Sequence, residues 1–219
     1  MKTLLIDQPA GIGDILFVQK ISKHYSENGF KVWHPVNDSI DWLPQYLDTV
    51  CKKEDCKNIN FDNYLKLDGC SNGTNYKIME AKYKTANLDY SNYIDYIDIK
   101  RNREKEDKLF DLLVGSNIPY RLVNSMYATP TTKTGGTLYM NVEKSTSIRN
   151  IEVSIISGYT LFDWIKIIEN ASEIYTTDTA IMYLIEKYPC VAKTLVCYSR
   201  RSSANEIDYL FKKPWKYII

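Results

Sequence analysis

Close to residue 1 the chain reads Gln8-Pro9-Ala10-Gly11-Ile12-Gly13-Asp14-Ile15-Leu16. The segment before it, residues 3–6, is short and apolar, which predicts a β-strand. Apolar residues after it recur at helical spacing, which predicts a helix over residues 14–27. Two glycines at a turn from strand to helix let the backbone approach a ligand closely. The stretch therefore predicts an α/β fold with a ligand site at its first turn.

The glycine turn departs from the dinucleotide-binding fingerprint G-x-G-x-x-G. Leu16 stands where the third glycine belongs, so the helix cannot approach the strand as closely. Asp14 stands at the start of the helix, where its carboxylate repels phosphate but is stabilised by the helix dipole. Asp14 is then either an N-cap or a catalytic carboxylate, and the residues of the turn leave both interpretations open.

Strands alternate with helices along both halves of the chain, which predicts two small Rossmann-like domains with open parallel sheets. A helix over residues 102–114 ends at a Gly-Ser-Asn-Ile-Pro breaker, so we expect an N-terminal domain over 1–118 and a C-terminal domain over 119–219. Ligands of such sheets bind beyond the carboxyl ends of the strands, and we expect the active site in a cleft between the halves. The other expected strands are residues 30–36, 64–67, 120–128, 138–142, 152–157, 173–176 and 193–198, and further helices are expected over 178–188 and from residue 204, before an aromatic tail.

The composition is that of an ordinary soluble protein, with 44% hydrophobic and 25% charged residues. A formal net charge of +1 provides no whole-molecule attraction to nucleic acid or to an anionic membrane. We expect no targeting segment and no transmembrane segment, and hence a cytoplasmic protein. Five cysteines and two histidines show no zinc-ligand spacing, which predicts reduced thiols and no metal site.

Two stretches resemble the heptosyltransferase-type enzymes of glycosyltransferase family 9. The first is the N-terminal strand, the turn Gly13-Asp14-Ile15-Leu16 and the helix that follows. The second begins at residues 159–171, which are similar to the helix before the donor motif of the family. It continues through Ser172-Glu173-Ile174-Tyr175-Thr176-Thr177-Asp178-Thr179-Ala180, which resembles the family's strand ending in Asp-Ser/Thr-Gly.

The resemblance implies a GT-B fold, with the acceptor bound by the N-terminal domain and the nucleotide-sugar donor by the C-terminal domain. It implies that Asp14 is the catalytic base, beside an acceptor-side loop that contains Gly11 and Gly13. It also implies donor contacts from Asp178 and Thr179, next to Thr177 in the same turn. The chain departs from the family at Ala180, which replaces glycine, and in lacking the histidine that follows. Plain helix capping is the alternative interpretation of this turn.

Two basic residues are further candidates for contacts with the donor phosphates. Lys133 lies in the segment Thr131-Thr132-Lys133-Thr134-Gly135-Gly136, whose composition suits either a loop over a diphosphate or a surface loop. Arg200 follows the last strand of the second half, on the side where a nucleotide would bind, and either pairs with phosphate or is solvated. A D-x-D motif is missing, so nothing supports a metal that holds the nucleotide-sugar.

These observations predict a metal-independent, inverting glycosyltransferase that moves a sugar from a nucleotide-sugar to a hydroxyl acceptor. A GT-B-like protein that binds nucleotide-sugars or glycans without catalysis is one alternative. A nucleotide-dependent oxidoreductase is another, against which the missing third glycine and Asp14 both argue. The sugar, the nucleotide base and the acceptor stay open at this point.

Overall fold

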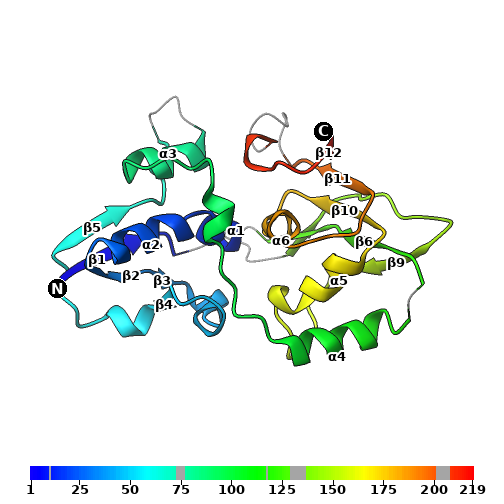
Figure 1. Ribbon diagram of the computed structural model, residues 1–219, viewed down its shortest axis with the longest axis horizontal. Coiled ribbons are helices and arrows are strands. Elements are labelled where there is room, and N and C mark those ends of the chain that lie inside the picture. Colours follow the sequence, from blue (N-terminus) through cyan, green and yellow to red (C-terminus); the bar gives the residue numbers. More distant parts are fainter. Residues whose placement is uncertain (10, 73–76, 117, 129–136, 201–207) are drawn as a thin grey trace. The chain divides into compact units, whose positions relative to one another are not determined.

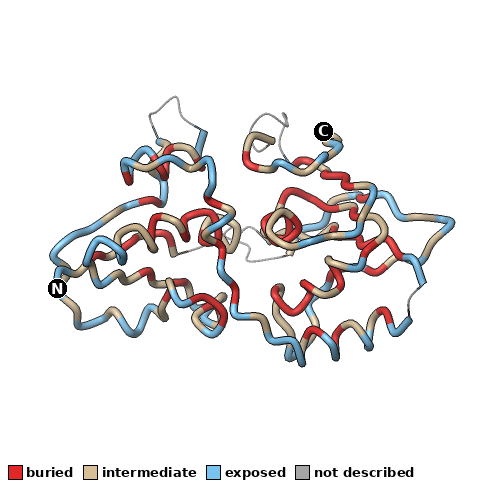
Figure 2. The backbone as a smooth tube through the Cα atoms, viewed as in Figure 1, coloured by how far each residue is buried: buried red, intermediate tan, exposed pale blue. Residues whose placement is uncertain are grey.

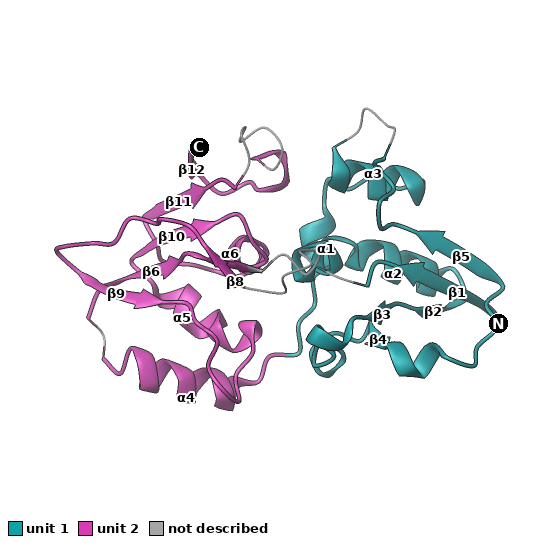
Figure 3. Ribbon diagram, turned by 180° about the vertical axis from the view of Figure 1, so that it is seen from behind, with its two compact units in different colours: residues 1–100 teal, residues 101–219 magenta. Residues whose placement is uncertain are grey.

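The computed structural model describes residues 1–9, 11–72, 77–116, 118–128, 137–200 and 208–219. The chain folds into two compact units, Met1–Lys100 (unit 1) and Arg101–Ile219 (unit 2), shown in different colours in Figure 3. The boundary lies before the helix over residues 102–114, whereas the sequence led us to expect it after that helix. The helix therefore belongs with the second unit instead of ending the first.

Unit 1 is built on a three-stranded parallel sheet in the order β2-β1-β5 (Figure 1). Its strands are β1 (Lys2–Asp7), β2 (Phe30–Trp33) and β5 (Asn63–Lys66). The predicted strand over 30–36 divides in two, because Pro35 has no amide hydrogen with which to continue the ladder. Its last residues form β3 (Pro35–Val36), which pairs with β4 (Cys51–Lys52) in a separate parallel pair.

The predicted helix after β1 is present but is interrupted at Val18, between α1 (Ile12–Phe17) and α2 (Gln19–Glu27). At the break the Gln19 side-chain amide donates a hydrogen bond to the Ile15 carbonyl, 2.9 Å away. Gly29 ends α2 with a φ of +84°, as the sequence predicted. The remaining helical segments of this unit are α3 (Ile78–Thr85) and the short turns η1 (Asp38–Ile40), η2 (Leu43–Gln45), η3 (Lys53–Cys56) and η4 (Tyr93–Tyr96).

Unit 2 contains a five-stranded, fully parallel sheet in the order β12-β11-β10-β6-β9. Every residue of β6 is buried, as expected of a parallel strand covered on both faces (Figure 2). The strands are β6 (Tyr120–Asn124), β9 (Arg149–Glu152), β10 (Glu173–Thr177), β11 (Thr194–Tyr198) and β12 (Trp215–Ile218).

Three sequence expectations for unit 2 are corrected by this sheet. The aromatic tail is the edge strand β12, and the segment expected to be a helix before it is described only as the short turn η7 (Asp208–Leu210). The strand expected over 152–157 is β9, which ends at Glu152. The strand expected over 120–128 ends at Asn124, and β7 (Met126–Ala128) forms an antiparallel hairpin with β8 (Thr137–Tyr139) instead of continuing into the sheet.

The helices of unit 2 are α4 (Arg103–Leu113), the turn η5 (Leu161–Trp164) that leads into α5 (Ile165–Asn170), and α6 (Ile181–Lys187). Arg101, two residues before the start of α4, explains why this helix belongs to unit 2. Its guanidinium donates to both carboxylate oxygens of Glu106 in α4 and to both of Glu169 in α5. The side chain of Glu106 is 1% exposed and that of Arg101 is 9% exposed, so α4 and α5 are held together by a nearly dry ionic cluster.

Both sheets have a point where the direction of winding reverses. In unit 1 the first strand, β1, lies between the second and third strands of its sheet, β2 and β5. In unit 2 the first strand, β6, likewise lies between the second and third, β9 and β10. Open α/β sheets bind ligands at the carboxyl ends of the strands beside such a reversal. Each unit therefore offers one edge for a site, at β1/β5 and at β6/β10.

Candidate functional site

Asp14 lies in the first turn of α1, directly beyond the carboxyl end of β1. Its carboxylate folds back over Gly11, the residue before the helix. A Cβ atom at Gly11 would lie 2.5 Å from Asp14 Oδ2 and would displace the carboxylate, and the φ of +79° at Gly11 would strain any side chain there. The Asp14 side chain is 34% exposed, which leaves it accessible to a substrate. Gly13 lies beside it within α1.

A lysine that the sequence analysis did not select completes this site. Lys82 in α3 is 1% exposed, and its ammonium lies 3.3 Å from Asp14 Oδ1. The ammonium also donates to the Gln8 side-chain oxygen and to the Leu67 carbonyl, the latter at 3.2 Å. Gln8 follows β1 and Leu67 follows β5, so the group sits where the winding of the sheet reverses. The feature of the sequence that could have pointed to Lys82 is that a charged residue stands beside Met79 and Tyr83, on the apolar face of α3.

His34 forms the inner wall of the same cluster and is fully buried. Its Nε2 lies 3.0 Å from the Gln8 carbonyl and its Nδ1 lies 3.4 Å from Ser22 Oγ. A carbonyl only accepts, so Nε2 carries the proton and Nδ1 accepts from the hydroxyl. The pKa of His34 is lowered from 6.5 to about 4, chiefly by burial and also by the nearby charge of Lys82, while the hydrogen bond to the Gln8 carbonyl opposes this shift. His34 is therefore a neutral, structural residue at neutral pH.

The low pKa of His34 makes stability depend on pH. Between pH 6.5 and about 4 the unfolded chain binds a proton at this histidine and the folded chain does not. The free energy of unfolding is then highest above pH 6.5, and we expect it to fall by about 3 kcal/mol as the pH is lowered to about 4. Urea unfolding of the wild type and of His34→Gln across this range measures the difference, which should be absent in the variant. His24→Gln, on a partly exposed position of α2, is the matched control, and equal slopes for wild type and His34→Gln would contradict the prediction.

In unit 2 three of the predicted donor residues lie at the end of β10, beside the second winding reversal: Thr177 is its last residue, and Asp178 and Thr179 follow it. The Thr177 side chain turns into the protein: its hydroxyl donates to Met140 Sδ at 3.0 Å, and the residue is fully buried. Thr179 is half-buried, and its hydroxyl accepts a hydrogen bond from Asn124 Nδ2 at 3.0 Å. The helix expected to start at Asp178 begins at Ile181, so these residues form a turn before α6 instead of its first turn.

The structure brings Asp178 and Arg200 together. Arg200 Nε lies 2.6 Å from Asp178 Oδ1, and an Nη of the same guanidinium donates to the Asp178 carbonyl at 2.7 Å. The Asp178 side chain is 2% exposed, whereas that of Arg200 is 28% exposed and lies 5.2 Å from the centre of the Tyr127 ring. Asp178 thus positions the arginine, and the arginine is the member of the pair that can reach a ligand. Lys133, the other basic candidate, lies outside the described residues.

Asn124 is a second residue that the sequence analysis did not select. It ends β6, is 3% exposed, and donates from Nδ2 to Thr176 Oγ1 at 2.9 Å as well as to Thr179. These bonds tie the carboxyl ends of β6 and β10 together beside the turn that carries Asp178. The signal in the sequence was a polar residue directly after the apolar pair Leu122-Val123, at the end of β6.

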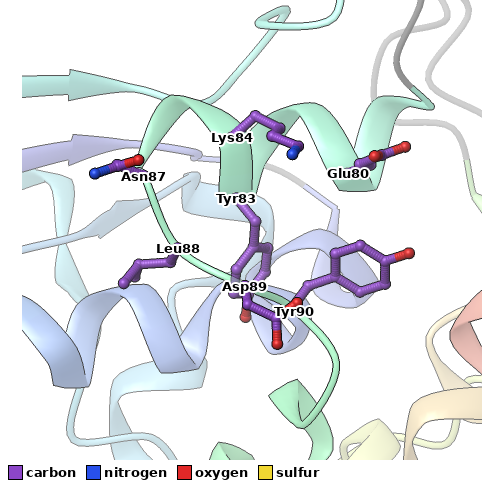
Figure 4. Close-up of a pocket in the computed structure, with 7 residues that line it drawn as sticks. All are labelled: Glu80, Tyr83, Lys84, Asn87, Leu88, Asp89 and Tyr90. Atoms are coloured by element: carbon purple, nitrogen blue, oxygen red, sulfur yellow. The ribbon is translucent and has the colours of Figure 1, made fainter.

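A small hollow in unit 1 does not coincide with either group of residues. It has a volume of about 220 Å³, below the usual 300–1,000 Å³ of small-molecule sites, and lies along α3 and the loop after it (Figure 4). Its lining residues are Glu80, Tyr83, Lys84, Asn87, Leu88, Asp89 and Tyr90. None of these residues was predicted to be functional from the sequence.

Neither a cluster of metal ligands nor a membrane span is found in the described ranges. Over those residues, no group of three His, Cys, Asp or Glu side chains is placed to hold a metal ion. All five cysteines are free thiols. No helix in the same part of the chain has both the length and the apolar character needed to cross a bilayer.

Known proteins resemble this one in structure and not in sequence. No protein-family model and no protein of curated function matches the sequence. The iron-containing dodecameric glycosyltransferase TibC from enterotoxigenic E. coli H10407 superposes with a TM-score of 0.60 at 8% identity, over 100% of this chain and 64% of TibC. A TibC structure in complex with ADP-D-β-D-heptose gives 0.57 at 9% identity, over 99% and 62%. A family 9 glycosyltransferase from Veillonella parvula DSM 2008 gives 0.50 at 7% identity, over 90% and 80%.

These similarities identify the fold. The chain has the α/β, GT-B-like fold of heptosyltransferases and family 9 glycosyltransferases, which confirms the predicted fold class and the resemblance. It spans just under two thirds of the length of TibC.

Proposed function

We propose that the protein is a glycosyltransferase that moves a sugar from a nucleotide-sugar donor to a hydroxyl acceptor. The observation that carries the proposal is Asp14, a partly exposed carboxylate held by a buried lysine beyond the carboxyl end of β1. A carboxylate in this position suits a general base, and the fold is one that glycosyltransferases use. The hydroxyl acceptor would be bound in unit 1, next to Gly11 and Gly13.

In the proposed reaction Asp14 takes the proton of the acceptor hydroxyl as its oxygen bonds to the anomeric carbon of the donor sugar. The bond from that carbon to the diphosphate oxygen breaks, and its electron pair leaves with the nucleoside diphosphate. Attack from the face opposite the leaving group inverts the configuration at the anomeric carbon. The proton remains on Asp14 until it is released to water.

The donor diphosphate would be bound in unit 2, at the β6/β10 edge. Arg200 supports this assignment because its guanidinium is partly exposed and is fixed from behind by Asp178. A planar cation in a fixed position suits the oxygens of a phosphate. Thr179 and Asn124 would hold the turn beside it. Lys133 remains a proposed contact.

Titration calorimetry with nucleotide-sugars, followed by transfer assays, tests the proposal. ADP-D-β-D-heptose is the first probe, because TibC has been crystallised with it, and UDP- and GDP-sugars follow. Binding that leads to transfer onto a hydroxyl acceptor supports a glycosyltransferase. We propose a metal-independent reaction, and TibC is described as iron-containing, so the assay is repeated with a chelator and the purified protein is analysed for iron. Loss of transfer on chelation would contradict metal independence.

One observation favours the alternative of a binding protein without catalysis. The side chains of Thr177 and Asp178 are buried and bonded within the chain, so the donor side offers few contacts of its own. The same experiment separates the two functions. Binding of a nucleotide-sugar without transfer to any acceptor, and without slow hydrolysis, favours the alternative.

Arg200→Met should weaken binding of ADP-D-β-D-heptose about tenfold to a hundredfold, because a charge-assisted hydrogen bond to phosphate is lost. The double variant Arg200→Met/Asp178→Asn avoids leaving a buried carboxylate without its cation, and should show the same loss. Lys193→Met removes the same charge from an exposed position before β11, at the opposite end of the strand that Arg200 follows, and is the matched control. Calorimetry measures the dissociation constants. Equal affinities for the control and the Arg200 variants would contradict a role in donor binding.

A further inference from the structure

Lys82 is a buried lysine, and a buried cation destabilises a fold unless it is paired and hydrogen-bonded. An ammonium group has three N–H donors. This one donates hydrogen bonds to the Gln8 side-chain oxygen and to the Leu67 carbonyl, and it forms an ion pair with Asp14, whose Oδ1 lies 3.3 Å away. The chemistry of these three partners shows what each contributes.

Two of the three partners are neutral: a side-chain amide oxygen of Gln8 and the backbone carbonyl of Leu67. Gln8 directly follows β1 and Leu67 directly follows β5, the two strands that meet at the winding reversal. These bonds fix the ammonium relative to the sheet whether or not Asp14 is present. Asp14 is the only charged partner among the three, so the positive charge of Lys82 acts on Asp14.

The two oxygens of Asp14 have different surroundings. Oδ1 faces the Lys82 ammonium, and Oδ2 lies over Gly11, where a Cβ atom would come within 2.5 Å of it. With one oxygen held from the interior and the other above a glycine, the carboxylate has a single defined orientation at the end of α1. The exposed part of the Asp14 side chain, about a third of its surface, is then accessible to a substrate.

We propose that Lys82 is a positioning residue for Asp14, which orients the carboxylate for proton abstraction and places a positive charge beside it. The inference rests on the function proposed above, in which Asp14 is the base. It also makes α3 part of the site, although nothing in the sequence of this helix resembles a catalytic motif. A lysine that only filled the interior would not influence the ionisation of Asp14.

Other titratable groups face this cluster and must be distinguished from Lys82. His34 faces it from the segment between β2 and β3 and is neutral above its pKa of about 4. Asp7 lies at the end of β1, where its carboxylate accepts a hydrogen bond from the Tyr64 hydroxyl, and that bond is the main reason that the pKa of Tyr64 is raised to about 12. Asp68 follows β5 and also acts on Tyr64. Lys82 is thus the cation among these groups at neutral pH.

The test uses the full chain and the variants Lys82→Met, Lys82→Gln and Lys82→Arg. Carboxyl ¹³C NMR of aspartate-labelled protein follows the titration of Asp14, and the transfer assay gives the rate as a function of pH. We expect Lys82→Met and Lys82→Gln to move the Asp14 midpoint and the acid limb of the pH–rate profile upward by about one pH unit or more. The rate at the plateau should fall about tenfold. Lys82→Arg keeps the charge and should restore most of the midpoint.

Lys84→Met is the matched control, because it removes the same charge from an exposed position of the same helix. It should leave the Asp14 midpoint unchanged. A second readout needs no activity: loss of the Lys82 charge should also raise the pKa of His34, which imidazole NMR measures. Lys82→Gln keeps a hydrogen-bond donor and carries the test if Lys82→Met does not fold.

The possible outcomes separate this inference from the proposed function. An unchanged Asp14 midpoint in folded Lys82 variants overturns the positioning role, even if the wild type transfers sugar. A shifted midpoint in a protein that transfers no sugar supports the pairing and overturns the glycosyltransferase function instead. A shift in both the midpoint and the acid limb, absent from Lys84→Met, supports both.

Discussion

Asp14→Asn should lower the rate of sugar transfer about 10²–10⁴-fold, the usual contribution of a general base, while leaving the affinity for the nucleotide-sugar nearly unchanged. The amide keeps the size of the carboxylate but cannot take the proton of an acceptor hydroxyl. Donor binding is proposed for residues of unit 2, which the substitution does not touch. Single-turnover transfer assays and calorimetry measure the two effects separately.

The same substitution also has an expected effect on stability. It leaves the buried Lys82 with neutral partners only, so we expect a loss of about 1–3 kcal/mol in the free energy of unfolding. Transfer is therefore measured well below the unfolding temperature of the variant. Asp41→Asn, which removes an exposed carboxylate of the same unit that pairs with Lys52, is the matched control and should keep both rate and stability. Transfer by Asp14→Asn at the wild-type rate would exclude Asp14 as the base.

Arg101→Met should destabilise unit 2 by about 3–5 kcal/mol, because it leaves the carboxylate of Glu106 buried without its main partner. The loss should appear in urea unfolding monitored by the fluorescence of Trp164, which lies in the turn η5 beside α4 and α5. It should be confined to unit 2, since the side-chain partners described for Arg101, which are Glu106, Glu169 and the ring of Tyr188, all lie in that unit.

Arg103→Met is the matched control for Arg101→Met. Arg103 is also near Glu106 and Glu169, but its side chain is 64% exposed and its guanidinium lies 3.7 and 3.9 Å from them. Exposed ion pairs of this kind contribute at most about 1 kcal/mol. Similar losses of stability for the two variants would show that α4 is not held by the buried cluster.

Much of the fold could be predicted from the sequence because its signals are local. The apolar strand β1 and the glycine that ends α2 depend on neighbouring residues only, and both are found as expected. The parallel arrangement followed from the alternation of strands and helices, since parallel neighbours need a long crossover. The carboxylate of Asp14 could also be identified from local sequence, because it is a charged group at a glycine turn.

Features that depend on distant residues could not be predicted. The aromatic tail becomes β12 only because β11 has a free edge at which it can pair. The first unit ends before α4 because Arg101 bonds to Glu106 and to Glu169, and the second of these lies in a different helix. Strand pairing and buried ion pairs join residues far apart in the chain, and local periodicity carries no information about them.

The sequence by itself determined the α/β class, the glycine turn and Asp14 as the residue on which to base a function. Only the tertiary structure decided what surrounds Asp14: the Lys82 ammonium, fixed by Gln8 and Leu67 at the ends of two neighbouring strands. It also decided that Asp178 is buried beneath Arg200 and that Asn124 ties β6 to β10. The physical reason is that local sequence sets backbone conformation, whereas the ionisation and orientation of a side chain depend on groups that meet only when the sheet has formed.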